Sequence, residues 1–222
     1  MKLSVKNLHF SYRTKYQTVH AVKDVTMDLE SGKMYALIGK SGCGKTTLLS
    51  LLAGLAKADK GEIVYDGKAL AEIDPDAYRR SMISVIYQSF NLFPLLNVIE
   101  NVMFPLLVSG MRKGDAVKKS ANMLHKVGLG ENYHRRLPSM LSGGEQQRVA
   151  IARALATDAG LILADEPTGN LDAENALQVV NLLKQITEDG TRSVLIVTHD
   201  MSVAGVADDV FEMESGRLKE QR

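Results

Sequence analysis

This sequence has one cysteine, no tryptophan and a net charge close to zero. The single cysteine, Cys43, excludes an internal disulfide framework and a zinc site built from cysteines, and it fits a reducing compartment. Lys and Arg together number 27, against 26 Asp and Glu, whereas a domain that holds nucleic acid through its phosphates is usually clearly basic. We therefore expect no nucleic-acid partner for this chain.

Long hydrophobic runs are also absent. The longest apolar stretch, from Leu48 to Ala56 with two interruptions, is well short of the ~20 residues that cross a bilayer. Any membrane association must therefore come through a partner. The 222 residues are 45% hydrophobic and 24% charged, which is the composition of a folded domain and not of a disordered or low-complexity chain.

Short apolar runs in the first third predict β structure that leads into a helix. Alternating apolar residues predict strands around Leu3–Phe10, with a slip in phase, and around Val25–Leu29. The continuous apolar run Met34–Ile38 is typical of a strand buried on both faces. A helix is expected over Thr46–Ala53, and Asp66-Gly67 is a candidate hairpin turn.

The rest of the chain divides into a helical block and a return to alternation. Within residues 90 to 158, a helix over Asp115–Val127 should stop at Gly128, and Asn97 should cap a helix that Pro105 ends or kinks. Alternation of strands and helices then favours an α/β fold with a mostly parallel sheet. Its expected elements are Leu161–Ala164, a helix near Ala173–Glu188, Val194–Thr198, a short helix and Val210–Met213.

The strongest chemical signal lies between the buried strand and the first helix. Residues Gly39 to Thr46 fit the pattern GxxxxGK(S/T), whose glycines let backbone N–H groups turn inward around an anion at a helix N-terminus. Lys45 would reach the β and γ phosphates of ATP, and the Thr46 hydroxyl would ligate Mg²⁺. The expected nucleotide-binding residues here are Gly39, Ser41, Gly42, Cys43, Gly44, Lys45, Thr46 and Thr47.

An acidic pair follows the apolar run Leu161–Ala164. Asp165 is placed to hold Mg²⁺, directly or through water, and Glu166 stands where a base could orient or deprotonate an attacking water. Carboxylates at strand ends are often only structural, but beside a phosphate loop the pair predicts nucleotide hydrolysis.

A third motif lies between these two, in the sequence LSGGEQQR at residues 141–148. Ser142 can cap the helix that follows, so that its N-terminus could hold a phosphate. The motif resembles the LSGGQ signature of ABC transporter ATPase subunits, with Glu145 in a place that glutamine often takes. The resemblance covers nearly the whole chain.

This resemblance implies a single ABC ATPase domain over residues 1–222. Its core would be a RecA-like P-loop NTPase fold at 1–87 and 159–222, with a mostly parallel sheet and an N-terminal antiparallel β region. A helical subdomain would be inserted at about 88–158.

Individual roles are implied in the same way. Tyr12 stands where the family has an aromatic residue that stacks on adenine. Gln88 matches the Q-loop glutamine that senses Mg²⁺ and the attacking water, and His199 matches the switch histidine that contacts the γ-phosphate. Residues Gly169 to Asp172 resemble the D-loop of the family, and Asp172 at its end would reach across to a partner subunit. Alone, an exposed tyrosine or a strand-end histidine is more often structural; the ordered set implies function.

The resemblance also implies a second copy of the chain as partner. In this family the signature of one copy contacts the nucleotide held by the other, so two chains enclose two ATP molecules head to tail. The residues that would do so are Ser142, Gly143, Gly144 and Glu145. ATP would bridge both copies and ADP would not, so hydrolysis would separate them.

A dense apolar segment follows Gln88 and has two interpretations. Its members either form the core of the helical subdomain or line a groove for a cytoplasmic helix of an integral membrane permease. A permease docked near the Q-loop would hold the chain at the cytoplasmic face of the cell membrane as a peripheral subunit. The residues concerned are Phe90, Leu92, Phe93, Leu95, Leu96, Met103 and Phe104.

The strings from Gln88 to Val102 and from Thr18 to Val22 resemble the macrolide-export, lipoprotein-release, peptide-resistance and FtsE-like branch of the family. That branch implies export of a peptide, lipoprotein or drug, or mechanotransmission. The alternative is a soluble ABC ATPase that acts on DNA or the ribosome, but no heptad tract separates Lys45 from Ser142 and only one set of motifs is present. A small-molecule P-loop kinase would leave the signature and His199 without a role.

Overall fold

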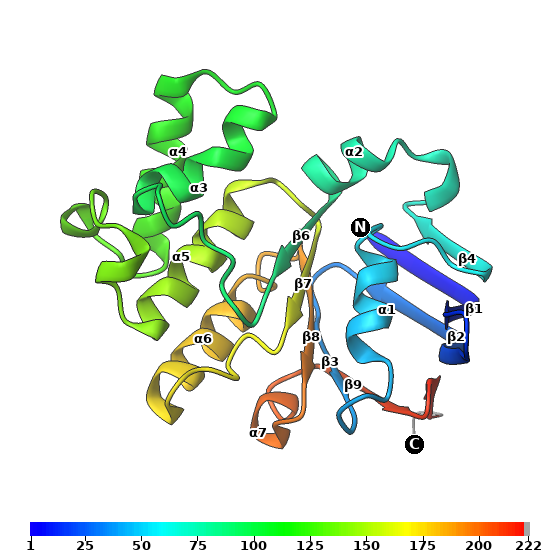
Figure 1. The fold of residues 1–222 in the computed structure, drawn as a ribbon. Helices are drawn as coiled ribbons and strands as arrows, with labels where there is room; N and C mark the ends of the chain where they lie inside the picture. Colours follow the sequence, from blue (N-terminus) through cyan, green and yellow to red (C-terminus); the bar gives the residue numbers. More distant parts are fainter. Residues whose placement is uncertain (220–222) are drawn as a thin grey trace.

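The computed structural model describes residues 1–219 and places them in two β-sheets with helices around the larger one (Figure 1). The core expected from the sequence extends to residue 222, and its last three positions lie outside the described residues. The α/β class, with a mostly parallel sheet and an N-terminal antiparallel region, is confirmed. Along residues 1–219, no helix combines the length and the apolar character that a membrane crossing needs.

The smaller sheet is antiparallel and has the strand order β2-β1-β4-β5. The expected slip in phase of the first strand is confirmed, because its register against β2 shifts on both sides of Leu8. Asp66 and Gly67 both have positive φ, 48° and 81°, as the two central residues of a type I′ hairpin turn require. The strands are β1 (Lys2–Arg13), β2 (Thr18–Glu30), β4 (Lys60–Tyr65) and β5 (Lys68–Ala69).

The larger sheet has the strand order β10-β9-β3-β8-β7-β6, and all its pairs are parallel except β9 with β10. Parallel strands place their carboxyl ends at one edge, where α/β folds bind ligands. The segments that follow β3, β7 and β8 therefore meet at this edge. The strands are β3 (Met34–Ile38), β6 (Ile83–Ile86), β7 (Leu161–Asp165), β8 (Ser193–Thr198), β9 (Asp209–Glu214) and β10 (Arg217–Leu218).

The helices lie on both faces of the larger sheet (Figure 1). Short 3₁₀ and π-helical turns occur at Leu70–Glu72, Tyr78–Met82, Glu131–Tyr133 and Pro138–Met140. The helix expected near Ala173–Glu188 ends three residues earlier. The α-helices are α1 (Lys45–Leu52), α2 (Pro75–Ala77), α3 (Val98–Val108), α4 (Lys113–Lys126), α5 (Gly143–Ala156), α6 (Ala173–Gln185) and α7 (Met201–Ala204).

Two hydrophobic cores form because side chains alternate across the larger sheet. Met34 of β3 belongs to the core beneath α3 to α7, whereas its neighbours Tyr35 and Leu37 belong to the core between this sheet, α1 and the smaller sheet. The continuous apolar run of β3 thus serves both faces, as a strand buried on both sides must. Because both faces of the larger sheet are covered, a ligand can reach the sheet only at the edge where the loops after the strands converge.

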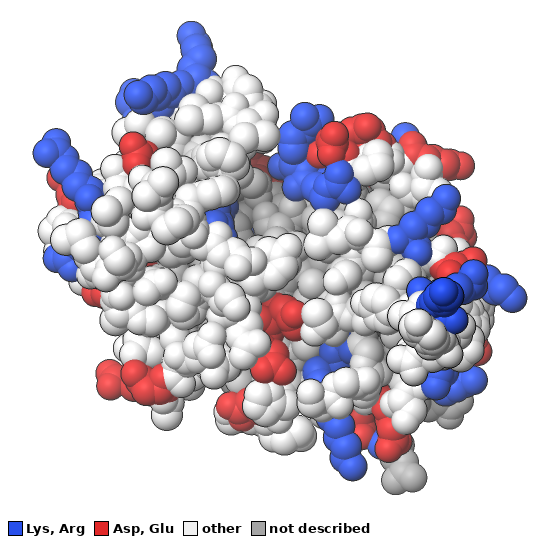
Figure 2. Space-filling model, in the orientation of Figure 1, with Lys and Arg blue, Asp and Glu red and all other residues white. Residues whose placement is uncertain are grey.

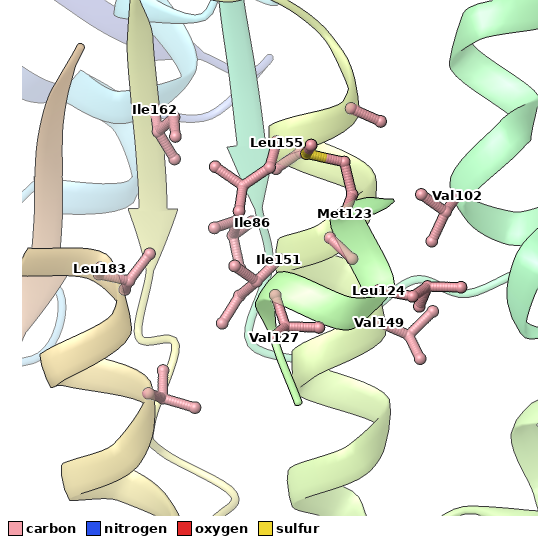
Figure 3. Close-up of a cluster of buried hydrophobic side chains, with 14 of the residues drawn as sticks. Ile86, Val102, Met123, Leu124, Val127, Val149, Ile151, Leu155, Ile162 and Leu183 are labelled. Atoms are coloured by element: carbon pink, nitrogen blue, oxygen red, sulfur yellow. The ribbon is translucent and has the colours of Figure 1, made fainter. Parts of the chain in front are cut away.

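Helix α5 packs on the sheet and on the other helices at once. Figure 3 shows Val149 of α5 beside Leu124 of α4, whereas Ile151 and Leu155 face Ile86 of β6. All these side chains are buried in one cluster. Helix α5 is therefore the element through which the helical segment between β6 and β7 is joined to the sheet.

Of the two effects expected of Pro105, a helix end or a kink, the first does not occur. Helix α3 continues to Val108 and ends where Gly110 adopts φ 86°. The N–H of Gly110 donates to the carbonyl of Leu107 and that of Met111 to the carbonyl of Leu106, which is a Schellman termination. Leu106 is buried in the cluster shared with α5, so packing of the last turn outweighs the roughly 3 kcal/mol that an interior proline costs.

A buried asparagine fixes the loop that enters α3. The Asn101 amide accepts a hydrogen bond from the Phe93 N–H at 2.8 Å and donates to the carbonyls of Phe93 and Leu96 at 3.1 and 2.8 Å. Its side chain has no exposed surface. The apolar segment after β6 is therefore held to α3 by hydrogen bonds as well as by packing.

We predict that Asn101→Ala lowers the free energy of unfolding by about 2–3 kcal/mol, because it leaves buried backbone groups of the loop without partners. Urea unfolding followed by circular dichroism measures this. The control is Leu95→Ala in the same loop, where the side chain is 89% exposed and a change within about 0.5 kcal/mol is expected. Equal stability of the two variants would contradict the prediction.

Candidate nucleotide-binding site

The loop between β3 and α1 is held between two other strands so closely that only glycine fits. A Cβ on Gly39 would lie 2.3 Å from the carbonyl oxygen of Met213 on β9, and one on Gly44 would lie 2.2 Å from that of Ala21 on β2. Gly44 also has φ 114°, a left-handed conformation that favours glycine. The path of the loop is thus fixed by backbone contacts on both sides.

The N-terminus of α1 differs from those of the other long helices at the site. Among the described residues no side chain caps it, and its first turn contains no acidic residue. By contrast, α3, α5 and α6 begin with Asn97, Ser142 and Asp172 as caps. The first N–H groups of α1 are therefore available to an anion, which the partial positive charge of the helix end also favours.

Lys45 lies almost entirely inside this loop, with 6% of its surface exposed. Its ammonium donates to the carbonyls of Gly39 at 2.7 Å and Lys40 at 3.1 Å. These bonds bend the side chain back over the concave side of the loop. The positive charge therefore faces the same space as the free N–H groups of α1.

Thr46 and Asp165 meet across the edge of the sheet. The Thr46 hydroxyl donates to the Asp165 carboxylate at 3.3 Å. Burial raises the pKa of the Asp165 carboxyl above its ordinary value, the Thr46 hydrogen bond opposes this, and the charge of Glu166 adds to it. A bound cation would relieve the penalty on this carboxylate, so the pair is a chemically sensible place for a hard metal ion.

Glu166 begins a tight turn at the end of β7. It adopts φ 44°, a conformation that non-glycine residues rarely adopt and that often occurs at functional sites. Its N–H donates to the carbonyl of Val197 on β8 at 2.9 Å, and its own carbonyl accepts from the N–H of Gly169 at 3.1 Å. These two bonds hold the turn and direct the carboxylate towards the end of β8.

Three of the expected catalytic side chains converge at this turn. The Glu166 carboxylate lies 3.1 Å from Nδ1 of His199, which follows β8. A Cβ on Gly169 would lie 2.8 Å from Nε2 of Gln88 and 3.4 Å from a carboxylate oxygen of Glu166. Gln88, Glu166 and His199 therefore come together around Gly169, although they follow three different strands.

Tyr12, on the smaller sheet, borders a cavity beside the phosphate loop that Glu166 also lines, whereas Gln88 and His199 are not part of its described lining. Its hydroxyl lies 3.3 Å from that of Thr47, and its ring packs edge-on against Phe10 at 5.0 Å between centroids. About half of its surface, 51%, is exposed. A planar base could stack on the free face of the ring. The cavity is lined by Tyr12, by Ser41 to Thr47 and by Glu166 among others.

The signature residues lie elsewhere, and none of them lines this cavity. Ser142 and Glu145 form a capping box at the start of α5, in which each side chain accepts from the backbone N–H of the other. The bond from the Ser142 N–H lowers the pKa of the Glu145 carboxyl. Gly143 follows the cap near the D-loop. Within one chain, the structure does not bring the signature to the phosphate loop.

Asp172 caps α6, accepting from the backbone N–H of Asn175 at 2.9 Å and from its side-chain amide at 2.8 Å. Asn175 also fills the space beside Gly144, where a Cβ would lie 2.4 Å from its amide oxygen. The D-loop and the signature helix are therefore in direct contact. Asp172 also does not line the cavity at the phosphate loop.

Sequence reasoning missed two residues that join these segments. Asn170 donates to the backbone carbonyl of Gln88 at 3.0 Å, and it could have been noticed because it lies within the D-loop sequence. Asn175 accepts from Arg148 of α5 at 3.4 Å as well as binding Asp172. No sequence signal marks Asn175, because its contacts join segments that are distant along the chain.

Comparisons with known proteins agree with this geometry. A model of the ABC transporter family matches residues 22–169. The lipoprotein-releasing system ATP-binding protein LolD of Saccharophagus degradans is 39% identical over 218 residues, which are 97% of this chain and 95% of that protein. The macrolide export ATP-binding/permease protein MacB of Hyphomonas neptunium is 39% identical over 219 residues, 97% of this chain and 34% of that protein.

A solved structure is also similar. It is the dimeric post-hydrolysis state of the ATP-binding cassette MJ0796 of Methanocaldococcus jannaschii, bound to ADP and Pi. The TM-score is 0.91 at 34% sequence identity, and the match covers 99% of this chain and 97% of that one. The likeness therefore extends over the whole fold and is not confined to the phosphate loop.

We predict that Gly169→Ala slows ATP hydrolysis by about 10- to 100-fold and leaves ATP affinity unchanged. The added methyl group would lie too close to the Gln88 amide, so the amide must move, and small misplacements of a catalytic group slow the reaction strongly. Gly169 does not need a left-handed φ, so the fold should tolerate the change. Steady-state hydrolysis and nucleotide binding are measured. The control is Gly114→Ala in the first turn of α4, where a Cβ meets nothing within 4 Å. Full activity of Gly169→Ala would contradict the prediction.

Proposed function

The chain belongs to the ABC transporter family as an ATP-binding, ATP-hydrolysing subunit, and we propose that it works by closing head to tail on a second copy of itself around two ATP molecules. The observation that carries the proposal is the separation of the two halves of the site. The phosphate loop and the uncapped end of α1 line one cavity, whereas the signature at the start of α5 does not reach it. A second copy would bring its signature to that cavity, and the similar MJ0796 cassette is a dimer.

Within one copy, the phosphates would bind at the N-terminus of α1. The side chain of Lys45 would exchange its bonds to the loop carbonyls for bonds to the β and γ phosphates. The adenine would stack on the exposed ring of Tyr12. Gly39, Ser41, Gly42, Cys43, Gly44 and Thr47 would supply the remainder of the phosphate cradle.

Oxygen donors that fit Mg²⁺ would lie beside bound phosphates. Thr46 and Asp165 already contact each other, and Asp165 is a partly buried carboxylate whose pKa burial raises. Gln88 would add an amide oxygen. Mg²⁺ bound there would neutralise charge on the β and γ phosphates.

Hydrolysis would depend on the side chains around Gly169. Glu166 would accept a proton from, or orient, the attacking water, and its fixed position at the end of β7 makes the direction of attack reproducible. The hydrogen bond between His199 and Glu166 holds the carboxylate, and the imidazole would contact the γ-phosphate. Gln88 would align the water from the opposite side.

The partner copy would contribute Ser142, Gly143, Gly144, Glu145 and Asp172. The contact between Asn175 and Gly144 supports this, because it joins the D-loop and the signature into one surface that can meet the second copy as a unit. ATP would contact both copies and ADP only one. Loss of the γ-phosphate would therefore open the dimer.

We further propose that the work of this cycle is delivered to an integral membrane permease. Residues 1–87 and 159–222 would act as the RecA-like core and about 88–158 as the helical subdomain. Between them lies a cavity, here called the docking groove, to which both contribute. Its lining includes Leu55, Arg79, Val85, Phe93, Phe104 and Arg153.

The apolar segment after Gln88 supports both of its interpretations. Met103 is buried in the core beside α5, with Leu92 packed against it. Phe93 and Phe104 instead pack against each other in the docking groove, with ring centroids 4.5 Å apart and ring planes tilted by 49°, and they are 39% and 41% exposed. Exposed aromatic side chains in a groove are typical of a helix-docking surface.

Docking would make the chain a peripheral subunit at the cytoplasmic face of the cell membrane. The similar macrolide export protein is named as both ATP-binding protein and permease, and this chain covers 34% of it. Together with the similar lipoprotein-releasing protein, this supports export of a peptide, lipoprotein or drug, or mechanotransmission, as the task of the complex.

We predict that Glu166→Gln retains ATP binding, loses turnover and accumulates as an ATP-bound dimer, because the amide keeps the shape of the site and cannot accept the proton. Size-exclusion chromatography with light scattering in saturating ATP and Mg²⁺ measures the dimer. Glu131→Gln, at an exposed position in a short 3₁₀ turn, is the control. Normal hydrolysis would show that the base is wrongly assigned, and a strictly monomeric variant would contradict the dimer.

We also predict that the chain sediments with membranes and is released by alkaline wash, since it has no spanning helix between residues 1 and 219. Phe104→Asp should shift it to the supernatant, because the carboxylate opposes an apolar contact. Val117→Asp on the exposed side of α4 is the control and should sediment like the wild type. A wild-type chain found only in the supernatant would favour a non-membrane partner.

A further inference from the structure

The docking groove is lined mostly by apolar side chains, with two basic ones among them. Phe93 and Phe104 pack against each other in this lining, and Arg79 and Arg153 also belong to it. No Asp or Glu belongs to the described lining. Figure 2 shows this hollow between the lobe of α3 and α4 and the lobe of α2, with basic atoms inside it and at its edge.

Arg153 carries a positive charge that this chain leaves uncompensated. Its guanidinium donates to the backbone carbonyls of Asn91 at 2.7 Å and Phe90 at 2.9 Å, and none of the described ion pairs includes it. Burial lowers its pKa. An arginine has five N–H donors, so donors remain for a further acceptor. A half-buried charge without a counter-ion is costly.

Arg79 is the second arginine of the groove lining, and its own ion pair is solvent-exposed. It donates to the carbonyl of Gly54 at 3.0 Å and pairs with Asp76 at 2.6 Å. The Asp76 side chain is 73% exposed, and exposed pairs of this kind contribute little. The other nearby acid, Asp158, is already paired with Lys119 and Arg192. The groove therefore has two guanidinium groups and no carboxylate assigned to its interior.

We propose that a helix of the permease occupies the docking groove and places a carboxylate between Arg153 and Arg79. This inference follows from the charges above and rests on the proposed function. The aromatic pair of Phe93 and Phe104 receives the apolar face of that helix. The carboxylate accepts bidentately from guanidinium, for which the planar fork of arginine is well suited. The acid supplies the charge that the isolated chain lacks.

The same guanidinium connects the groove to the catalytic glutamine. Phe90 and Asn91, whose carbonyls Arg153 holds, have φ 58° and 46°, and two successive left-handed non-glycine residues are strained. They lie just after Gln88 in the chain. Arg153 therefore holds the backbone just after Gln88 and still keeps donors for the carboxylate of the permease helix.

The experiment measures docking of the full chain on proteoliposomes that carry the membrane subunit with which it copurifies. We expect Arg79→Gln to weaken docking at least tenfold and to reduce its salt dependence, because a charge pair is lost. Asp76→Asn frees Arg79 and should dock as tightly as the wild type or tighter. Arg112→Gln removes the same charge from a position whose side chain is 91% exposed, outside the groove, and should have no effect.

A second arm tests the partner and does not depend on the folding of groove variants. Each Asp and Glu in the cytoplasmic loops of the membrane subunit is changed to its amide. One such change should weaken docking as much as Arg79→Gln, and combining the two should add little further loss. Arg79→Glu together with a lysine at that partner position should restore docking. A merely structural role of Arg79 would not produce this rescue.

Three outcomes separate the claims. Tenfold weaker docking with charge-reversal rescue supports the inference. Docking of Arg79→Gln and Arg153→Gln that equals that of Arg112→Gln overturns the inference and leaves the proposed function standing. A wild-type chain that docks on no membrane subunit overturns both.

Discussion

The site depends on one constraint, the confinement of the β3–α1 loop between the backbones of β2 and β9. The carbonyl oxygens of Ala21 and Met213 approach so closely that positions 44 and 39 accept only hydrogen as a side chain. The loop therefore has one path, and that path leaves the first N–H groups of α1 and the ammonium of Lys45 facing the same space. Every other part of the site is arranged with respect to this fixed anion cradle.

Helix α5 transmits that arrangement to the rest of the molecule. Its buried side packs on β6 and on α3 and α4 (Figure 3), its first residues carry the signature, and Arg153 near its other end holds the carbonyls that follow Gln88. One rigid helix thus touches the Q-loop, the D-loop and the surface offered to a second copy. A rotation of α5 would change all three together, because the close packing of its core leaves little room for independent movement.

The sequence predicted the elements whose cause is local. The phosphate loop, the acidic pair after β7, the hairpin at Asp66-Gly67 and the phase slip near Leu8 follow from glycine geometry and alternation, and the structure has these elements there. Pro105 does not end α3, because the termination of this helix is decided by Gly110 and by the burial of Leu106. Asn170 and Asn175 were missed because their partners lie far away in the chain, and no spacing rule encodes such contacts.

The use of caps fits the proposed closure on a second copy. Ser142 and Asp172 each accept from one backbone N–H in the first turn of α5 and α6, so these helix ends are ordered without a ligand. Helix α1 has no such cap among the described residues and leaves its donors to the triphosphate. A helix whose first turn is capped within the chain can serve as a rigid contact surface. A helix whose first N–H groups lack acceptors needs the nucleotide to supply them. In the proposed dimer, ATP would complete α1 of one copy and offer its γ-phosphate to the capped end of α5 in the other, which would couple nucleotide binding to association.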